Sequence, residues 1–305
     1  MERYPCNVID LMDMFPTEEA CLEYLSLVRW PDGYSCLRCG SKACWKKARG
    51  LFCCRDCGYE GSALCGTIFQ DTHKPLRLWF QAIWYAVNQK NGVSALGLQR
   101  ALGLGSYHTA WEWMHKLRCA MVRPGRDRLS GFIEIDETFI GGVRSGKRGR
   151  GADGKTLVFV AAERKEPYGI GRIRLMKIQD ASGVSLSDAV RQTIEPGSKV
   201  RSDGWDGYNA LLSEGYMHLP IIHKNARSGD ATPVTHRVIA LLKRWLLGTH
   251  QGAACSPGYL PYYLDEFTFR FNRRTSRSRG KLFYRLVQQA AQTEPLPASL
   301  IASRG

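Results

Sequence analysis

The sequence has no apolar stretch close to the roughly 20 residues that a helix needs to cross a bilayer. Its N-terminal stretch, MERYPCNVIDLMDMFPTEEACLEYL, carries acidic side chains and lacks the apolar core of a secretion signal. These absences argue against a membrane-embedded or secreted protein. We therefore expect a cytoplasmic, nucleoid-associated protein of a prokaryote with no membrane partner.

Acidic side chains are also scarce, with 28 Asp and Glu against 43 Lys and Arg, which leaves a net charge of +15. Such an excess favours a polyanionic partner, because each neutralised phosphate releases counterions. The 305 residues are 44% hydrophobic, enough for one large domain and one or two small ones. We find no internal repeat.

Eleven cysteines are present, and an odd number clustered at metal spacing in a long chain argues for metal instead of disulfides. CLRCG and CRDCG form two pairs, and each pair is followed by a glycine that suits a tight turn. Cys53 is an alternative to Cys54, although its spacing to the last cysteine is worse. The pattern predicts a closed, structural Zn²⁺ site in a zinc ribbon, held by Cys36, Cys39, Cys54 and Cys57.

Apolar periodicity changes along the chain. The first part is helical around a cysteine-rich, turn-rich segment, and from about residue 131 short β-rich runs alternate with helices. Two adjacent antiparallel strands followed by β-α-β alternation indicate an α/β fold, with a mixed sheet flanked by helices. We predict DGYNALLSEG as a short helix and, as domains, a helical lead-in 1–30, the zinc ribbon 31–70, a helical region 71–124, a sheet domain 128–250 and a C-terminal basic helical extension 251–305.

The stretch GVSALGLQRALGLGSYHTAWEWMHKLRCAM has the outline of a helix-turn-helix, with a glycine-containing turn between two helices. Tyr107, His108 and Lys116 are then candidates to face DNA. The alternative is a helical spacer in which Trp111 and Trp113 fill a core.

Acidic side chains interrupt two predicted strands. In FIEIDETFIGG, alternation places Glu134 and Asp136 on one face of the sheet, and in KVRSDGWDGY Asp203 stands where a strand ends. Carboxylates at such positions in one sheet can hold Mg²⁺ for phosphoryl transfer. The alternative is that Asp203 caps the next helix and Asp136 pairs with an arginine.

Taken together, five stretches resemble the insertion-sequence transposases that join an N-terminal zinc ribbon to an RNase H-like, DDE-type domain. They are CRDCGYEGSALCGTIFQ with LRLWFQAIW, IEIDETFIGG, SDGWDGYNAL, HRVIALLKRWLLGTHQG and YLDEFTFRFNRR, in the order that this family shows. The resemblance implies an RNase H-like sheet and divalent-metal-dependent cutting and joining of DNA. It makes Asp136 the first catalytic acid and Asp203 the second.

In this family a third metal ligand lies on a helix, seven residues before a lysine. By that resemblance the positions are His236 and Lys243, an Asp-Asp-His-Lys variant of a site that more often has glutamate. Seven residues are two helical turns, so both side chains share a face. Thr232 or Thr235 offers an N-cap, and the positive end of the helix dipole there favours neutral, ligating imidazole. Imidazole suits Mn²⁺ better than Mg²⁺.

Three acids compete with the histidine as third ligand. Glu266 is the main competitor, and its alternative role is an ion pair with Arg270 or Arg273. Asp230 lies just before the helix in a glycine-containing loop, and Asp265 adjoins Glu266.

Two basic segments are candidates for DNA contact. RSGKRGRGADGK is rich in glycine, which predicts a hairpin loop, and RFNRRTSRSRGK combines six basic residues with neighbouring aromatic side chains. The alternative for the first is a solvated loop. The candidates for DNA contact in these segments are Lys147, Arg148, Arg150, Arg273, Arg274, Arg277 and Arg279, and the resemblance adds Lys243.

The sequence thus predicts a transposase that binds the terminal inverted repeats of a transposon and target DNA, cuts at the ends and transfers strands. Ends must be paired, so we expect a homodimer or larger assembly on DNA. A catalytically inactive, transposase-derived regulator and another RNase H-like DNA nuclease are the alternatives.

Overall fold

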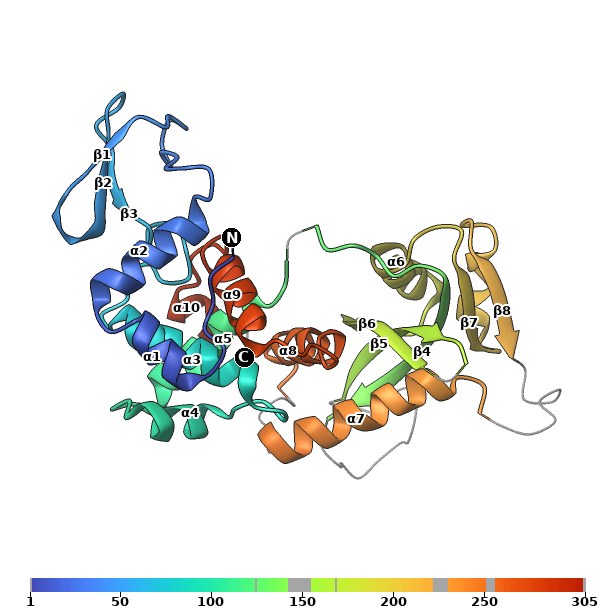
Figure 1. The fold of residues 1–305 in the computed structure, drawn as a ribbon. Coiled ribbons are helices and arrows are strands. Elements are labelled where there is room, and N and C mark those ends of the chain that lie inside the picture. The colour runs from blue at the N-terminus through green and yellow to red at the C-terminus, as the bar shows by residue number, and fades with distance from the viewer. Residues whose placement is uncertain are drawn as a thin grey trace. The chain divides into compact units, whose positions relative to one another are not determined.

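A computed structural model describes residues 2–123, 125–141, 155–167, 169–221, 230–250 and 256–303 (Figure 1). The chain divides into two compact units, and the first unit is discontinuous. Unit one consists of Met1–Arg123 with Ser276–Ser303, and unit two spans Pro124–Thr275. The predicted C-terminal extension is therefore shared between the units instead of forming a segment by itself.

Unit two contains a five-stranded mixed sheet with the order β6-β5-β4-β7-β8. The first three strands along the chain are antiparallel neighbours, whereas β7 and β8 lie parallel on the other side of β4. This topology confirms the predicted mixed α/β, RNase H-like fold. The strands are β4 (Phe132–Ile140), β5 (Thr156–Lys165), β6 (Gly169–Ile178), β7 (Lys199–Asp203) and β8 (Met217–Ile221).

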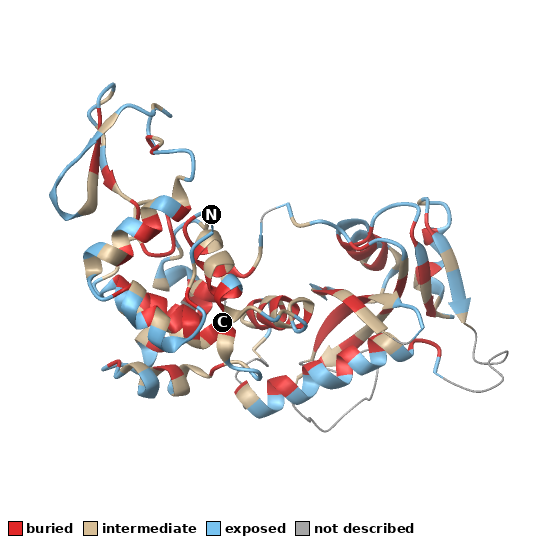
Figure 2. Ribbon diagram, viewed as in Figure 1, coloured by how far each residue is buried: buried red, intermediate tan, exposed pale blue. Residues whose placement is uncertain are grey.

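Helices cover both faces of this sheet, so the strands carry apolar side chains on each side. One core lies between the sheet and the helices α7 (Pro233–His250) and α8 (Leu260–Asn272), and includes Val160 and Leu242. The opposite core lies against α6 (Gly183–Thr193) and includes Ile135. Figure 2 shows α7 with buried residues on one side and exposed residues on the other, as an amphipathic helix requires.

One segment of unit two does not form the α-helix that the sequence predicts. DGYNALLSEG contains a 3-10 helix, η2 (Asp206–Leu211), instead of an α-helix. The apolar run after it is β8, the edge strand of the sheet. The other edge, β6, is bonded by the side chain of Asn272, whose amide accepts from Ile173 N at 2.7 Å and donates to Ile173 O at 3.1 Å.

Unit one combines a small three-stranded sheet with helices. Serine, threonine or asparagine side chains accept backbone N–H groups at the starts of α1, α2, α4, α5 and α9, as the N-cap rule leads one to expect. The strands are β1 (Cys44–Lys46), β2 (Leu51–Cys54) and β3 (Glu60–Ser62), with η1 (Ala48–Gly50) between the first two. The helices are α1 (Val8–Met14), α2 (Glu18–Arg29), α3 (Leu76–Asn88), α4 (Ala95–Leu102), α5 (Tyr107–Ala120), α9 (Arg279–Ala290) and α10 (Ala298–Ala302).

An aromatic cluster joins the two pieces of unit one. The Phe283 ring of α9 lies 5.7 Å from Phe80, 5.9 Å from Phe15 and 6.0 Å from Trp84, measured between ring centroids. Phe283 is fully buried. Helix α9, from the end of the chain, therefore completes a core that begins in the first 90 residues.

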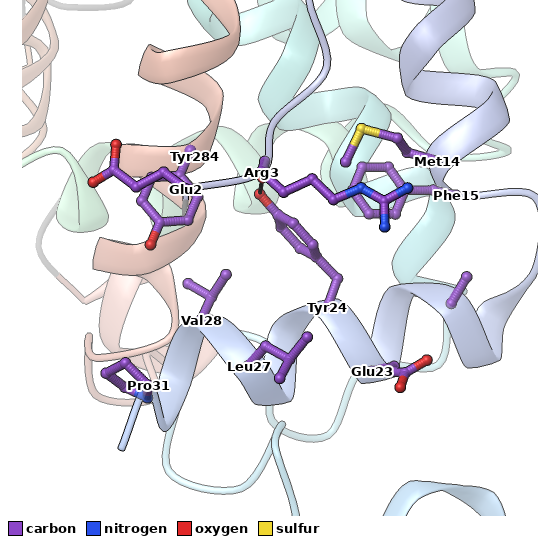
Figure 3. Close-up of a pocket in the computed structure, with 11 residues that line it drawn as sticks. Glu2, Arg3, Met14, Phe15, Glu23, Tyr24, Leu27, Val28, Pro31 and Tyr284 are labelled. Atoms are coloured by element: carbon purple, nitrogen blue, oxygen red, sulfur yellow. Dashed lines mark hydrogen bonds between the residues drawn. The ribbon is translucent and has the colours of Figure 1, made fainter. Parts of the chain in front are cut away.

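A pocket of about 680 Å³ also lies in unit one (Figure 3). The Tyr24 hydroxyl reaches across it and donates a hydrogen bond to Arg3 O at 2.8 Å. Its lining mixes apolar side chains such as Leu27 with the charged Glu2 and Glu23, and includes no predicted site residue. Of the helices that the structure describes, none combines the length and apolar character of a bilayer-crossing segment.

Candidate active site and metal centre

Four thiol groups converge at the ribbon. The ligand atoms of Cys36, Cys39, Cys54 and Cys57 all lie within 4.8 Å of one another, and two pairs of sulfurs are 3.6 Å apart. A tetrahedral Zn²⁺ with bonds of about 2.3 Å would separate its sulfurs by about 3.8 Å, so the four fit this ion. The predicted cysteine set is the one that the fold assembles, and the Cys53 thiol points instead towards backbone carbonyls at 3.9 and 4.0 Å.

The backbone at each cysteine pair forms the expected tight turn. Gly40 N donates to Cys36 O at 2.9 Å and Gly58 N donates to Cys54 O at 3.1 Å. Both glycines have positive φ, at 73° and 68°, which a side chain would strain. Burial tends to raise the pKa of Cys36, and backbone N–H groups such as that of Arg38, whose nitrogen lies 3.4 Å from the sulfur, lower it.

Asp136 lies in the middle of β4, on the face that α7 covers. Its Oδ1 accepts Glu137 N at 2.8 Å, and its Oδ2 accepts the Thr232 hydroxyl at 3.0 Å. Burial raises the pKa of Asp136 to about 6, against the lowering effect of the Glu137 N–H and of His236. A carboxylate with so little solvation gains from a bound cation.

Asp203 ends β7, the parallel neighbour of β4. The β4–β7 pairing ends at Glu134 and Arg201, and strand alternation puts Asp203, two residues further along, on the same face of the sheet as Asp136. One oxygen of Asp203 accepts Trp205 N at 3.2 Å, so it also forms the turn that leads into η2. The structure therefore brings the two predicted acids to one region of the sheet.

His236 lies in the first turn of α7 and faces the first acid. Its Nε2 is 3.0 Å from Oδ2 of Asp136, and the ring remains 53% exposed. Among the described residues, the four cysteines form the one set of three or more metal-ligand atoms within 4.8 Å. Asp203 thus belongs to the same face but does not reach both other groups at that spacing.

Glu134 was not predicted as a site residue, and it fixes the start of α7. This fully buried carboxylate accepts Val234 N at 2.8 Å and pairs with Arg164 at 3.3 Å. Thr232 takes the expected N-cap position, since its carbonyl accepts His236 N at 3.0 Å, but its hydroxyl donates to Asp136 and the acceptor for Val234 N is Glu134. The sequence could have indicated Glu134, because it lies two residues before Asp136 and strand alternation puts both side chains on one face of the sheet.

Lys243 follows His236 two turns along α7 and is exposed. Partial desolvation of its ammonium group and the charge of Lys155 lower its pKa, whereas Asp136 raises it, so the lysine lies within electrostatic reach of the first acid. The competing acid Glu266 is fully buried and pairs with Arg270 at 2.8 Å, which is the structural alternative considered for it.

The candidate DNA-binding residues lie in different surroundings. On α5, Tyr107 is 50% exposed and His108 is also exposed, whereas Trp113 stacks on Trp79 in the core with centroids 3.9 Å apart. Lys116, on the same helix, is half-buried. The two helices of the predicted helix-turn-helix, α4 and α5, pack together across a left-handed glycine turn.

The arginines of the second basic segment are divided between the units. Arg273 lies over the Phe269 ring, and Arg274 lies over the Phe271 ring and donates to Phe271 O at 2.8 Å, so these two pack on α8 of unit two. Arg277 and Arg279 belong to unit one, where they line a pocket with Trp84. Lys147, Arg148 and Arg150 lie outside the described residues.

The sheet topology, the two acids on β4 and β7 and the cysteine cluster define an RNase H-like nucleic-acid-processing protein with a structural zinc ribbon. Residues 128–272 match the family model of the ISXO2-like transposase domain, and residues 16–60 match that of the transposase zinc-ribbon domain. The chain belongs to the insertion-sequence transposases that carry a zinc ribbon before a DDE-type domain. This family implies a nuclease or transferase activity in general and suggests DNA binding.

A relative spans almost the whole chain. It is described as an uncharacterized protein in the transposable element ISH50 of Halobacterium salinarum. It is 24% identical over 299 residues, which cover 91% of this chain and 98% of that protein. The similarity therefore extends over the zinc ribbon, the helical region and the sheet domain alike.

Proposed function

We propose that this chain is an active transposase that binds the ends of its insertion sequence, cuts DNA there and transfers the freed strands into target DNA. The observation that carries the proposal is the approach of His236 Nε2 to Asp136 Oδ2, 3.0 Å apart, at the face of the sheet where Asp203 ends the neighbouring strand.

The donor set fits a divalent ion. Adjacent ligands of an octahedral Mg²⁺ or Mn²⁺ with bonds of about 2.1 Å are about 3.0 Å apart, which matches the separation between Asp136 and His236. Asp136, His236 and Asp203 would hold the ions. Ions held there would activate an attacking water or DNA 3′-hydroxyl and stabilise the leaving oxygen.

The remaining residues position the reacting groups. Glu134 fixes the start of α7 and so the place of His236 relative to Asp136. Lys243, exposed on the same helix face, would contact a DNA phosphate. The net charge of +15, the α4–α5 pair and the exposed arginines would supply non-specific attraction for the transposon ends and the target. We further propose that two or more copies act together in the cytoplasm of a prokaryote.

The test is strand transfer with the full-length, zinc-loaded chain and DNA that carries the terminal repeats. Asp136→Asn and Asp203→Asn should abolish cleavage, and His236→Ala should lower it at least 100-fold in both Mg²⁺ and Mn²⁺. His236→Glu should keep measurable activity, because it restores a metal ligand, and should shift the preference from Mn²⁺ towards Mg²⁺. The matched control is Glu266→Gln, which preserves the contact with Arg270 and should remain active.

Three results would contradict this assignment, each in favour of a different ligand or function. Full activity of His236→Ala together with an inactive Glu266→Gln would make Glu266 the third ligand. No nicking in either metal, with DNA binding retained, would identify a regulator. Cleavage of branched DNA without any need for terminal repeats would identify another RNase H-like nuclease.

A further inference from the structure

The imidazole of His236 lies between two carboxylates. Its Nε2 faces Asp136 Oδ2 at 3.0 Å, and its Nδ1 faces Asp230 Oδ2 at 2.6 Å. Asp230 is thus bonded to the ring nitrogen on the side away from the first acid. The sequence offered Asp230 only as a competing third ligand, and the family matches assign it no part in positioning the histidine.

Asp230 is itself held in place. Its second oxygen, Oδ1, accepts Thr232 N at 3.1 Å, a turn in which the side chain bonds the backbone two residues on. The hydroxyl of Thr232 in turn donates to Asp136 at 3.0 Å. One short segment, Asp230–Thr232, therefore contacts the first acid and the histidine together, just before α7 begins.

An imidazole that binds a metal carries its single proton on either Nδ1 or Nε2, and only the other ring nitrogen can be the ligand. His236 is 53% exposed, so packing alone does not lock its ring. A carboxylate that accepts the Nδ1 proton leaves Nε2 as the ring nitrogen that faces the first acid, where a divalent ion held by both groups would replace the proton that they share.

We propose that Asp230 is a positioning residue of the candidate active site, which holds the His236 ring through Nδ1 so that Nε2 faces the place of the divalent ion beside Asp136. This role rests on the proposed function, in which His236 is a metal ligand. Asp230 acts through His236 and is not itself a ligand, because its Oδ2 is bonded to the ring and its Oδ1 to the backbone.

The first test measures Mn²⁺ binding to the full-length, zinc-loaded protein by electron paramagnetic resonance of the free ion. Asp230→Ala should weaken Mn²⁺ binding 10- to 100-fold, the usual loss when the partner of a ligating histidine is removed. Asp230→Asn, which keeps an acceptor oxygen, should lose less. Asp180 provides the matched control, since it accepts Ser182 N at 3.0 Å in the same kind of turn before α6. Asp180→Ala should leave Mn²⁺ affinity unchanged.

A double-mutant cycle separates positioning from direct ligation. In the His236→Ala background, adding Asp230→Ala should cause no further loss of Mn²⁺ affinity. An equal loss in both backgrounds would show that Asp230 binds the ion itself or acts through the general fold, and would overturn the proposal.

The tautomer can be observed directly. Nitrogen spectra of zinc-loaded protein with ¹⁵N-labelled histidine, saturated with Mg²⁺, should show His236 protonated at Nδ1 and unprotonated at Nε2, with its signals identified by their absence in His236→Ala. Asp230→Ala should return these signals towards those of the protein without Mg²⁺, and a wild-type ring protonated at Nε2 in saturating Mg²⁺ would contradict the proposal. If Asp136→Asn and His236→Ala both leave Mn²⁺ binding intact, the proposed function fails. If they weaken binding and Asp230→Ala does not, only the positioning role fails.

Discussion

The buried carboxylate of Glu134 fixes the position of helix α7 on the sheet. Removing Glu134 would leave the Val234 N–H and Arg164 without their shared acceptor. Glu134→Ala should therefore lower the free energy of unfolding of unit two by about 2 kcal/mol, and Glu134→Gln by less because an acceptor oxygen remains. Scanning calorimetry of the unit-two transition measures this. Glu166→Gln, at the 70% exposed second partner of Arg164, is the control and should change stability by less than about 0.5 kcal/mol.

The raised pKa of Asp265 predicts that the free energy of unfolding of unit two depends on pH. Burial raises its pKa from 3.8 to about 6, despite Arg126 at 3.7 Å. The folded state thus keeps a proton that the unfolded state releases, so this stabilisation is full below about pH 4 and is lost as pH rises through 6. Because the side chain is 27% exposed, we expect a loss on the order of 1–2 kcal/mol.

The comparison between wild type and Asp265→Asn isolates this effect. The asparagine variant cannot release a proton, so its midpoint temperature should rise relative to wild type between pH 4 and pH 7. Scanning calorimetry of the unit-two transition measures the difference. A difference that stays constant over this range would mean that Asp265 is ionised in the folded protein at low pH.

Among single residues, the candidate ligands were easier to predict than the residues that support them. Acids within apolar strands indicated Asp136 and Asp203, and the resemblance to the transposase family, which has a lysine seven residues after its third ligand, indicated His236. Asp230 lies in a polar, glycine-containing loop, where an acid is ordinary, so only the folded position of the ring reveals its contact. Likewise, a helix cap from a residue 100 positions away, such as Glu134, leaves no local pattern near α7.

The zinc ribbon is the element that depends most on a single interaction. Its three short strands bury few apolar side chains, so the metal must supply much of the folding free energy, typically about 10 kcal/mol or more in such modules. Removal of zinc by a strong chelator should expose residues 31–70 to protease while unit two keeps its own unfolding transition. Cys54→Ser should reduce bound zinc from one to none per chain, whereas Cys53→Ser should retain it, as atomic absorption can measure.

Helices and central strands were predictable because their signals are local. Capping residues such as Thr17 and Ser106 mark helix starts, and the continuous apolar run of β5 marks a strand covered on both faces. The sequence did not predict that η2 is a 3-10 helix or that β8 pairs with β7. Both depend on what packs against the neighbouring strand. Cross-sheet contacts such as the Asn272 amide on β6 are equally invisible to a local pattern.

Unit one is built from both ends of the chain, whereas the sequence predicted domains that simply follow one another along the chain. Phe283→Ala should remove a fully buried ring from the aromatic cluster and lower the stability of unit one by about 3–5 kcal/mol. In calorimetry the unit-one transition should fall while the unit-two transition stays in place. Val184→Ala, at a 78% exposed position of unit two, should leave both unchanged.

The discontinuity of unit one also sets an order of events during protein synthesis. Domains fold as units while the chain emerges from the ribosome. Unit two, whose described residues end before α9, can close while the ribosome still holds the last residues. The helices at the start of the chain emerge first, yet they lack Phe283 and its neighbours until α9 is made. The part of this transposase that is translated first is therefore the part that finishes folding last.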